Sequence, residues 1–242
     1  MPLSRNFLVF LLLFSMAPAW GQAQPPVKTI DPWEPMNRKL YVFNDTLDRY
    51  LLKPVAKGYH FVMPDFAERG VSNFIGNIYE VNSFFNGILQ GQFTGAAYSG
   101  GRFVVNSTVG LLGLFDVATS MGITIHPADF GQTLSVWGVG SGPFVMMPII
   151  GPRTVRSTVG YFVDTYTSIP AFWETKYAWT FWTVEVIDYR VQLLDAEDLM
   201  TGDRYIFMRD AYLSRRAAFV NRGVVVDNFS DYEEGEEDFE EF

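Results

Sequence analysis

Few residues in this 242-residue chain have the types and spacing that catalytic chemistry requires. The two histidines, His60 and His126, are far apart, and neither belongs to a metal-ligand spacing such as His-x-x-x-His. Ser141 lies in the glycine-rich segment Gly138–Gly142, which has the spacing of neither a nucleophile elbow nor a dinucleotide-binding loop. The sequence therefore predicts no catalytic residues, no metal site and no cofactor.

Residues 129–160 combine polar side chains with an apolar run. Six glycines and three prolines within these 32 residues predict a shaped loop in place of a continuous helix. The apolar run Phe144–Ile150 lies inside the segment, and it is flanked by four polar residues: Asp129, Gln132, Arg153 and Arg156. We expect apolar and charged surfaces to lie side by side here.

The composition indicates a protein that lies in a membrane surface. Aromatic residues make up 17% of the chain, yet beyond the N-terminus no apolar run reaches the roughly 20 residues of a membrane-spanning helix. The sequence contains no cysteine, which excludes disulfides, thiolate metal sites, a cysteine nucleophile and a lipid attached through an N-terminal cysteine.

The N-terminus has the pattern of an export signal. Arg5 provides a positive charge, Phe7–Phe14 is a short apolar run, and small residues follow, so residues 1–23 are predicted to be a signal peptide. A linker at residues 24–30 and a helical domain at residues 31–222 complete the predicted body.

Residues 223–242 are predicted to be a disordered acidic tail. Residues 227–242 hold nine of the 27 acidic residues, and the remaining 18 match the 18 Lys and Arg in number. A docking peptide for a basic partner is the alternative role for this tail. Because the body is neutral and its basic residues are dispersed, no nucleic-acid partner is expected.

Helical periodicity predicts an all-α fold. Asp31 is expected to cap a first helix, with Pro32 in its first turn, and the apolar stripe runs from Met36 to Leu51. Pro54 and Pro64 are expected to divide the following region. Later helices are predicted from Pro64 to about Leu89 and near residues 94–107, 155–166, 184–194 and 205–219, and a strand only near residues 220–227.

Six aromatic residues crowd into residues 172–182. Such rings favour the headgroup level of a bilayer, so we expect Trp173, Tyr177, Trp179 and Trp182 to lie at the membrane interface. Packing in the protein core is the alternative.

Short blocks in a fixed order make this sequence similar to one known family. The blocks are Asp31-Pro-Trp-Glu34, Asn37–Asn44, Lys53–Ala56, Val71–Phe74, Arg102-Phe103, Asn106, Asp129–Leu134, Trp137–Gly140, Gly142-Pro143 and Gly151-Pro152. With these blocks the sequence resembles the MlaA/VacJ family across roughly residues 30–215.

The resemblance implies a ring-shaped, all-helical protein with a central channel, which performs no bond chemistry. It implies a location in the Gram-negative outer membrane, on the periplasmic face and beside a trimeric porin. Phospholipid misplaced in the outer leaflet would pass through the channel to a periplasmic lipid-carrier protein. The outer-membrane bilayer would thereby keep its lipid asymmetry.

The resemblance also implies roles for individual residues. Asp129, Gln132, Arg153 and Arg156 are expected to line the channel or its rim, where an arginine can bind a phosphate. The alternative is that these four residues cap helices and pair with one another. Val42 and Phe43 lie in a segment expected to influence channel gating, with plain helix packing as the alternative.

Two other functions stay open at this point. One is a non-transporting accessory protein that docks on a porin, and the other is a periplasmic lipid-handling enzyme. Many family members carry a lipid-modified cysteine after the signal, which this sequence lacks, so attachment is expected to rest on apolar surface, aromatics or a partner.

Overall fold

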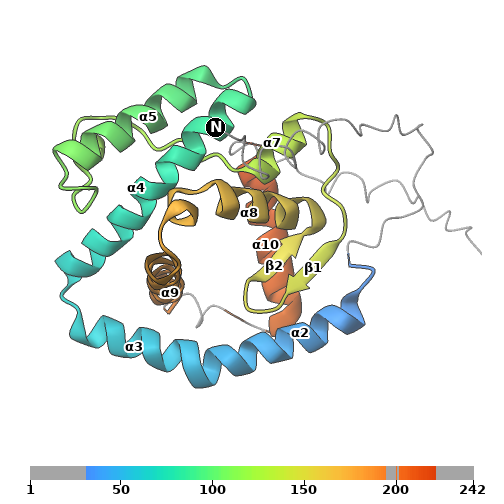
Figure 1. Ribbon diagram of the computed structural model, residues 1–242. Coiled ribbons are helices and arrows are strands. Elements are labelled where there is room, and N and C mark those ends of the chain that lie inside the picture. Colours follow the sequence, from blue (N-terminus) through green and yellow to red (C-terminus); the bar gives the residue numbers. More distant parts are fainter. Residues whose placement is uncertain (1–30, 195–199, 201, 222–242) are drawn as a thin grey trace, which may run out of the picture. The chain divides into compact units, whose positions relative to one another are not determined.

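The computed structural model describes residues 31–194, 200 and 202–221 (Figure 1). The predicted signal peptide, the linker at residues 24–30 and the acidic tail at residues 223–242 lie outside the described residues, as do residues 222–227 of the predicted strand. The described chain is mostly helical, which confirms the predicted all-α class.

A long helical rod forms the first part of the described chain. It consists of α2 (Glu34–Leu47), the π-helix η1 (Asp48–Leu52) and α3 (Lys53–Val62) (Figure 1). Pro54 and Pro64 mark off a short helix, α3, as predicted. Pro54 lies in the first turn of α3, directly after a wide π turn in which the Lys53 N–H donates to the Asp48 carbonyl, so the helical path continues from α2 into α3 without a break.

The predicted helix cap at Asp31 is wrong. α2 begins at Glu34, with Trp33 in the N-cap position and Pro35 in the first turn. Asp31 instead accepts hydrogen bonds from Asn37 Nδ2, at 2.8 Å, and from the hydroxyl of Tyr205 on α10 (Arg204–Val220). A tertiary contact therefore occupies the carboxylate that the sequence pattern assigned to the helix end.

Two antiparallel helices, α4 (Asp65–Leu89) and α5 (Phe93–Thr108), pack closely against each other. The predicted start after Pro64 is confirmed, and so is the helix predicted near residues 94–107. Gly91 forms the turn between the helices with a φ of 71°. A Cβ on Gly87 would lie 3.1 Å from the Ala96 Cβ, so the missing side chain permits the close approach.

The segment predicted as a shaped loop contains regular structure. It begins with α7 (Phe130–Val136) and continues with an antiparallel hairpin of β1 (Phe144–Met147) and β2 (Gly151–Thr154), in which Val145 pairs with Arg153. Strands of four residues are too short to show a clear alternation, and proline within β2 argues against a strand in the sequence. A short helix, α6 (Val117–Ser120), precedes this region.

The helices α8 (Val155–Thr167) and α10 agree with those predicted at residues 155–166 and 205–219. The helix predicted at residues 184–194 is α9 (Thr175–Gln192), which begins nine residues earlier and includes most of the aromatic segment. The 3₁₀-helix η2 (Ile169–Phe172), which precedes α9, was not predicted. Contacts between elements form a closed circuit: α3 leads into α4, α4 packs on α7, α7 on α8, α8 on β2, β2 pairs with β1, and β1 packs on α2 (Figure 1). This circuit agrees with the predicted ring-like order, and α9 contacts both α3 and α4.

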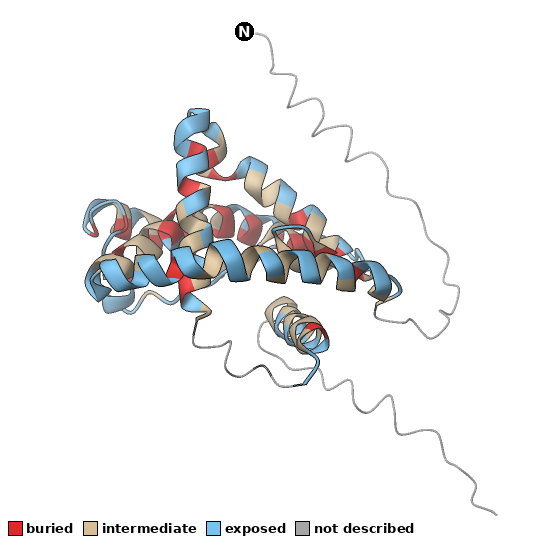
Figure 2. Cartoon of the chain, turned by 90° about the horizontal axis from the view of Figure 1, so that it is seen from below, coloured by how far each residue is buried: buried red, intermediate tan, exposed pale blue. Residues whose placement is uncertain are grey.

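The distribution of polarity is inverted relative to most water-soluble proteins. Among the described residues, buried polar side chains outnumber buried apolar ones, and the two apolar clusters are small: Ile75, Ile78 and Phe181 form one, and Phe144, Met146 and Tyr205 the other. Many large apolar side chains are exposed instead. The rod of α2, η1 and α3 buries only Asn37 and Ala56, as its mostly blue and tan surface in Figure 2 shows.

None of the helices that the structure describes has the length and apolar character needed to span a bilayer.

Candidate anion-binding site

Two arginines, Arg153 and Arg156, lie within electrostatic reach of a third, Arg216, and the three come from three different elements. Arg153 is in β2, Arg156 is in the first turn of α8, and Arg216 is near the end of α10. The charge of Arg216 lowers the pKa of both other guanidinium groups, in each case after the larger effect of burial. We call Arg153, Arg156 and Arg216 the arginine cluster.

Asp129 connects this cluster to α7. Its carboxylate accepts two hydrogen bonds from Arg216, one from Nη2 at 2.9 Å and one from Nη1. The same carboxylate caps α7 by accepting the Gln132 backbone N–H at 2.6 Å. The side chains are 13% exposed for Arg216 and 34% exposed for Asp129, so solvent weakens the pair only in part.

Arg153 and Arg156 have no carboxylate partner among the described residues. The Arg153 guanidinium stacks 4.0 Å from the centre of the Tyr161 ring, and Arg156 Nη1 donates to the Val139 carbonyl at 2.7 Å. Within the described chain, the Nε atoms of all three arginines are buried and lack a hydrogen-bond acceptor.

The charges in this region do not balance. Arginine stays protonated, so the cluster carries three positive charges, and Asp129 is the one described carboxylate that pairs with it directly. Burial lowers the pKa of Arg153 and Arg156, and the charge of Asp129 opposes that effect without outweighing it. Burial also opposes ionisation of Arg216, but the hydrogen bond and charge of Asp129 outweigh it and raise the pKa.

A second carboxylate, Asp164 on α8, acts on Arg216 at longer range. It accepts hydrogen bonds from the Phe130 N–H at 2.8 Å and from Asn86 Nδ2 at 2.9 Å. Burial raises the pKa of Asp164 to about 6, the two hydrogen bonds oppose that rise, and the charge of Asp129 adds to it. Near neutral pH the site still carries an excess of positive charge that an anion can neutralise.

Two glycines bring the elements of the site together. A Cβ on Gly160 of α8 would lie 2.3 Å from the Gly131 backbone N of α7, and a Cβ on Gly131 would lie 2.6 Å from Arg216 Nη2. At the start of α8, Thr154 and Ser157 form a reciprocal capping box that fixes the strand–helix junction between Arg153 and Arg156. Small residues and a cap therefore set the positions of the charged side chains.

All four predicted lining residues belong to this region. Asp129 and Gln132 lie on α7, and the Gln132 Nε2 donates to the Phe219 carbonyl of α10 at 3.1 Å. The alternative was that the four residues only cap helices and pair with one another. Asp129 does cap a helix, but it pairs with Arg216 and with neither Arg153 nor Arg156. Arg216 was not among the residues predicted from the sequence.

The residues predicted for gating and for the membrane interface lie elsewhere. Val42 and Phe43 on α2 are 60% and 51% exposed, so packing within the described chain does not account for them. Trp173 and Trp182 pack against the apolar cluster around Phe181, and Tyr177 and Trp179 are largely exposed. The four aromatics therefore divide into two partly buried and two exposed residues.

The histidines do not form a metal site. His60 pairs with Glu68 at 2.8 Å, and His126 contacts Thr124 and stacks on Tyr98. The described residues contain no group of three or more His, Cys, Asp or Glu side chains that could hold a metal ion.

Comparison with known proteins identifies the family. The family model described as MlaA lipoprotein matches residues 29–219, which include Asp129 and the whole arginine cluster. The chain belongs to the MlaA family. The predicted resemblance is therefore confirmed, and it extends over the described body.

Individual MlaA relatives are similar over most of their length. The intermembrane phospholipid transport system lipoprotein MlaA of Escherichia coli (strain K12) is 36% identical over 199 residues, which cover 80% of this chain and 79% of the relative. The protein of the same name in Haemophilus influenzae is 32% identical over 206 residues, or 82% of each chain.

A solved structure agrees with the fold. It is described by the words "Structural basis for maintenance of bacterial outer membrane lipid asymmetry", is 36% identical, and superimposes with a TM-score of 0.71 over 79% of this chain and 99% of that chain. The MlaA fold thus extends to this sequence.

Proposed function

We propose that this chain is an outer-membrane phospholipid transport protein that removes mislocalised phospholipid from the outer leaflet and maintains lipid asymmetry. The single observation that carries the proposal is the arginine cluster, in which three cations share one paired carboxylate. A phospholipid supplies the missing anion through its phosphate, and guanidinium groups bind phosphate oxygens in a favourable planar geometry. The names of the MlaA relatives support the same substrate.

The exposed apolar surface supports a location in a bilayer leaflet. Contiguous residues after α5 expose Val109, Leu111, Leu112, Leu114 and Phe115. Leu111 and Leu112 both have a positive φ, at 52° and 61°, a conformation that costs free energy in residues other than glycine. Water would not offset that cost, whereas burying two leucines in acyl chains would.

In the proposed mechanism the headgroup follows a polar path inside the closed circuit of elements. Polar side chains inside the circuit and the arginine cluster provide hydrogen bonds in place of those that the phosphate loses when it leaves water. The acyl chains stay in contact with apolar side chains. Phospholipid then leaves the periplasmic face for a soluble lipid carrier, and a trimeric porin holds the protein in place. The chain binds and releases the lipid without breaking a covalent bond.

Binding measurements with purified protein test this function. We expect a short-chain phosphatidylglycerol to bind more tightly than a diacylglycerol with the same acyl chains, because only the first carries a phosphate. The double variant Arg153→Gln/Arg156→Gln should lose about tenfold or more of the phospholipid affinity, since charge-assisted hydrogen bonds contribute about 1.5–3 kcal/mol each.

Arg215→Gln is the matched control, because Arg215 is an exposed residue next to Arg216 on the same helix. Its affinity should equal that of the wild type. Equal phospholipid binding by the double variant and the wild type would contradict the proposed role of the cluster. Chemically altered lipid after incubation would support a lipid-handling enzyme instead, and no bound lipid at all would support a porin accessory.

A further inference from the structure

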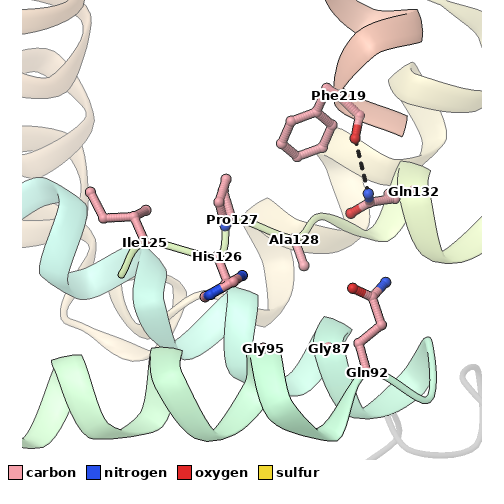
Figure 3. A pocket seen from close by; sticks show the side chains of 9 residues that line it. All are labelled: Gly87, Gln92, Gly95, Ile125, His126, Pro127, Ala128, Gln132 and Phe219. Carbon is pink, nitrogen blue, oxygen red and sulfur yellow. Dashed lines mark hydrogen bonds between the residues drawn. The ribbon is translucent and has the colours of Figure 1, made fainter. Parts of the chain in front are cut away.

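The end of α10 lies next to the arginine cluster. Close to this end, the Phe219 carbonyl accepts a hydrogen bond from Gln132 Nε2 of α7 at 3.1 Å (Figure 3). Arg216 lies five residues before Asn221, the last described residue, which corresponds to about 8 Å along a helix axis. The part of the chain that follows residue 221 is therefore attached beside the cluster.

That part of the chain is strongly acidic. The tail at residues 223–242 carries nine Asp and Glu and no Lys or Arg, whereas the remaining 18 acidic residues of the chain match its 18 Lys and Arg in number. Asp231 follows Asn221 by ten residues, and a chain of that length spans up to about 33 Å. The carboxylates from Asp231 onward can therefore reach the cluster.

Within the described chain, the cluster offers guanidinium groups that lack a carboxylate partner. Arg153 and Arg156 have none, and Asp129 pairs directly with Arg216. All three arginines of the cluster are partly exposed, so an anion can contact them from solvent. Other described arginines form ion pairs with N–O distances of 2.6–2.8 Å, and these are Arg38, Arg49, Arg102, Arg190 and Arg209.

A carboxylate of the tail offers the cluster the same chemistry as a phospholipid phosphate. Each group carries one negative charge on two oxygens that accept hydrogen bonds from a guanidinium. A single, partly exposed ion pair is weak. A covalently attached group, however, acts at an effective concentration of about millimolar, and the tail carries nine carboxylates. The tail is therefore a competitor of phospholipid at this site.

We propose that the acidic tail binds the arginine cluster when phospholipid is absent, and that a phospholipid phosphate displaces it. Three neighbouring, partly buried guanidinium groups are costly without anions, and the tail supplies those anions until a lipid does. The basic partner of the tail is then the chain's own cluster. This regulation rests on the proposed phospholipid function and adds an internal competitor to it.

Paired spin labels test the position of the tail. Because the sequence has no cysteine, two introduced cysteines are the only attachment points. Val139→Cys places one label beside the cluster, since Val139 is 46% exposed and its backbone carbonyl accepts from Arg156 Nη1 at 2.7 Å. Glu234→Cys places the other label in the tail. In the purified full chain we expect a narrow distribution of label distances.

Short-chain phosphatidylglycerol should make this distribution broad, whereas a diacylglycerol with the same acyl chains should leave it narrow. Arg153→Gln/Arg156→Gln should give a broad distribution without lipid. Arg215→Gln, on the same helix as Arg216, is the matched control and should keep the narrow one. A broad distribution in the wild type, or a narrow one in the double variant, would overturn the proposal.

Lipid affinity gives an independent measurement. Replacing the nine tail acids by Asn and Gln keeps the length of the tail and should raise the affinity for short-chain phosphatidylglycerol about three- to tenfold. The same replacement in the Arg153→Gln/Arg156→Gln background should have almost no effect. An equal gain in both backgrounds would indicate general charge repulsion of the lipid and would contradict binding of the tail to the cluster.

The outcomes separate this inference from the proposed function. If phospholipid binding depends on Arg153 and Arg156 but the label distances do not, only the inference about the tail is wrong. If no phospholipid binds to any variant, including the one with a neutral tail, the proposed function is wrong, and displacement by phospholipid with it.

Discussion

At the scale of single residues, Asp164 connects three elements of the site. It lies on α8, accepts the Phe130 N–H at the start of α7 and accepts Asn86 Nδ2 from α4. Burial raises its pKa from 3.8 to about 6. Between these two values the unfolded chain has released the proton that the folded chain still holds. The contribution of Asp164 to stability is therefore present below about pH 4 and lost as the pH rises through about 6.

We predict that Asp164→Asn changes the pH dependence of stability. The free energy of unfolding of the wild type minus that of the variant should fall by roughly 2 kcal/mol between pH 4 and pH 7, because each pKa unit corresponds to about 1.4 kcal/mol and part of the effect is already lost at pH 4. Urea unfolding at a series of pH values measures this difference. Asp210→Asn, at an exposed carboxylate, controls for the loss of one charge. Identical pH profiles for wild type and Asp164→Asn would contradict the assignment.

Most residues of the candidate site could be predicted from the sequence, but the partner charge of Asp129 could not. Asp129, Gln132, Arg153 and Arg156 stand out because they flank an apolar run in a matching block. Arg216 lies 87 residues from Asp129, on a helix that carries several arginines of similar appearance. Arg216 differs from the other arginines of α10 only because it lies where α10 contacts α7. That tertiary contact cannot be predicted from the spacing of residues in the sequence.

At the scale of elements, the α7–α8 crossing depends on the absence of side chains. We predict that Gly160→Ala lowers the melting temperature by several degrees, because its Cβ would lie 2.3 Å from the Gly131 backbone and overpacking costs about 1–3 kcal/mol. Gly76→Ala in α4 is the control, since its Cβ meets nothing within 4 Å and alanine favours a helix. Thermal unfolding followed by circular dichroism should separate the two variants. A Gly160→Ala protein as stable as Gly76→Ala would count against this crossing.

The rod is attached to the hairpin through two asparagines on one face of α2. Asn37 bonds to the Phe144 carbonyl and the Met146 N–H, and Asn44 bonds to the Met147 carbonyl and the Ile149 N–H. Seven residues, or about two turns, separate the asparagines, so both side chains reach β1 and the turn after it. Val42 and Phe43 lie between them and point outward.

We predict that deleting Val42 and Phe43 makes cells accumulate phospholipid in the outer leaflet. The deletion rotates one asparagine by about 200° relative to the other, so both can no longer bond to the hairpin. Val42→Ala/Phe43→Ala keeps the spacing and should leave the outer leaflet nearly normal. Labelling of surface-exposed phospholipid measures the effect. A normal outer leaflet in the deletion strain would refute the prediction.

The elements themselves were predictable to different degrees. Long helices with a clear apolar stripe, such as α4 and α8, follow from periodicity. The hairpin does not follow from periodicity, because its strands have only four residues each. The π turn does not either, because it differs from an α-helix only in that the Lys53 N–H bonds five residues back, to Asp48. The cap at Asp31 failed because Tyr205, 174 residues away, competes for the carboxylate.

At the scale of the whole molecule, the described residues bury polar side chains and expose apolar ones, which supports the proposed location in a lipid leaflet. The composition predicted an apolar surface, but it could not divide the aromatics of residues 172–182 between core and surface. Phe181 is buried and Trp179 is exposed only because α9 turns one face toward α4. The inverted polarity gives the arginine cluster its importance, since a charged headgroup needs such partners to leave water.

The central claim is that the arginine cluster passes the phosphate of misplaced phospholipid. The most direct measurement is the amount of outer-leaflet phospholipid in a Gram-negative strain that lacks its own family member and produces this chain. We predict that the wild type and Arg215→Gln restore a low level, whereas Arg153→Gln/Arg156→Gln, present at equal abundance in the same membrane fraction, leaves it high. Full restoration by the double variant would contradict the account.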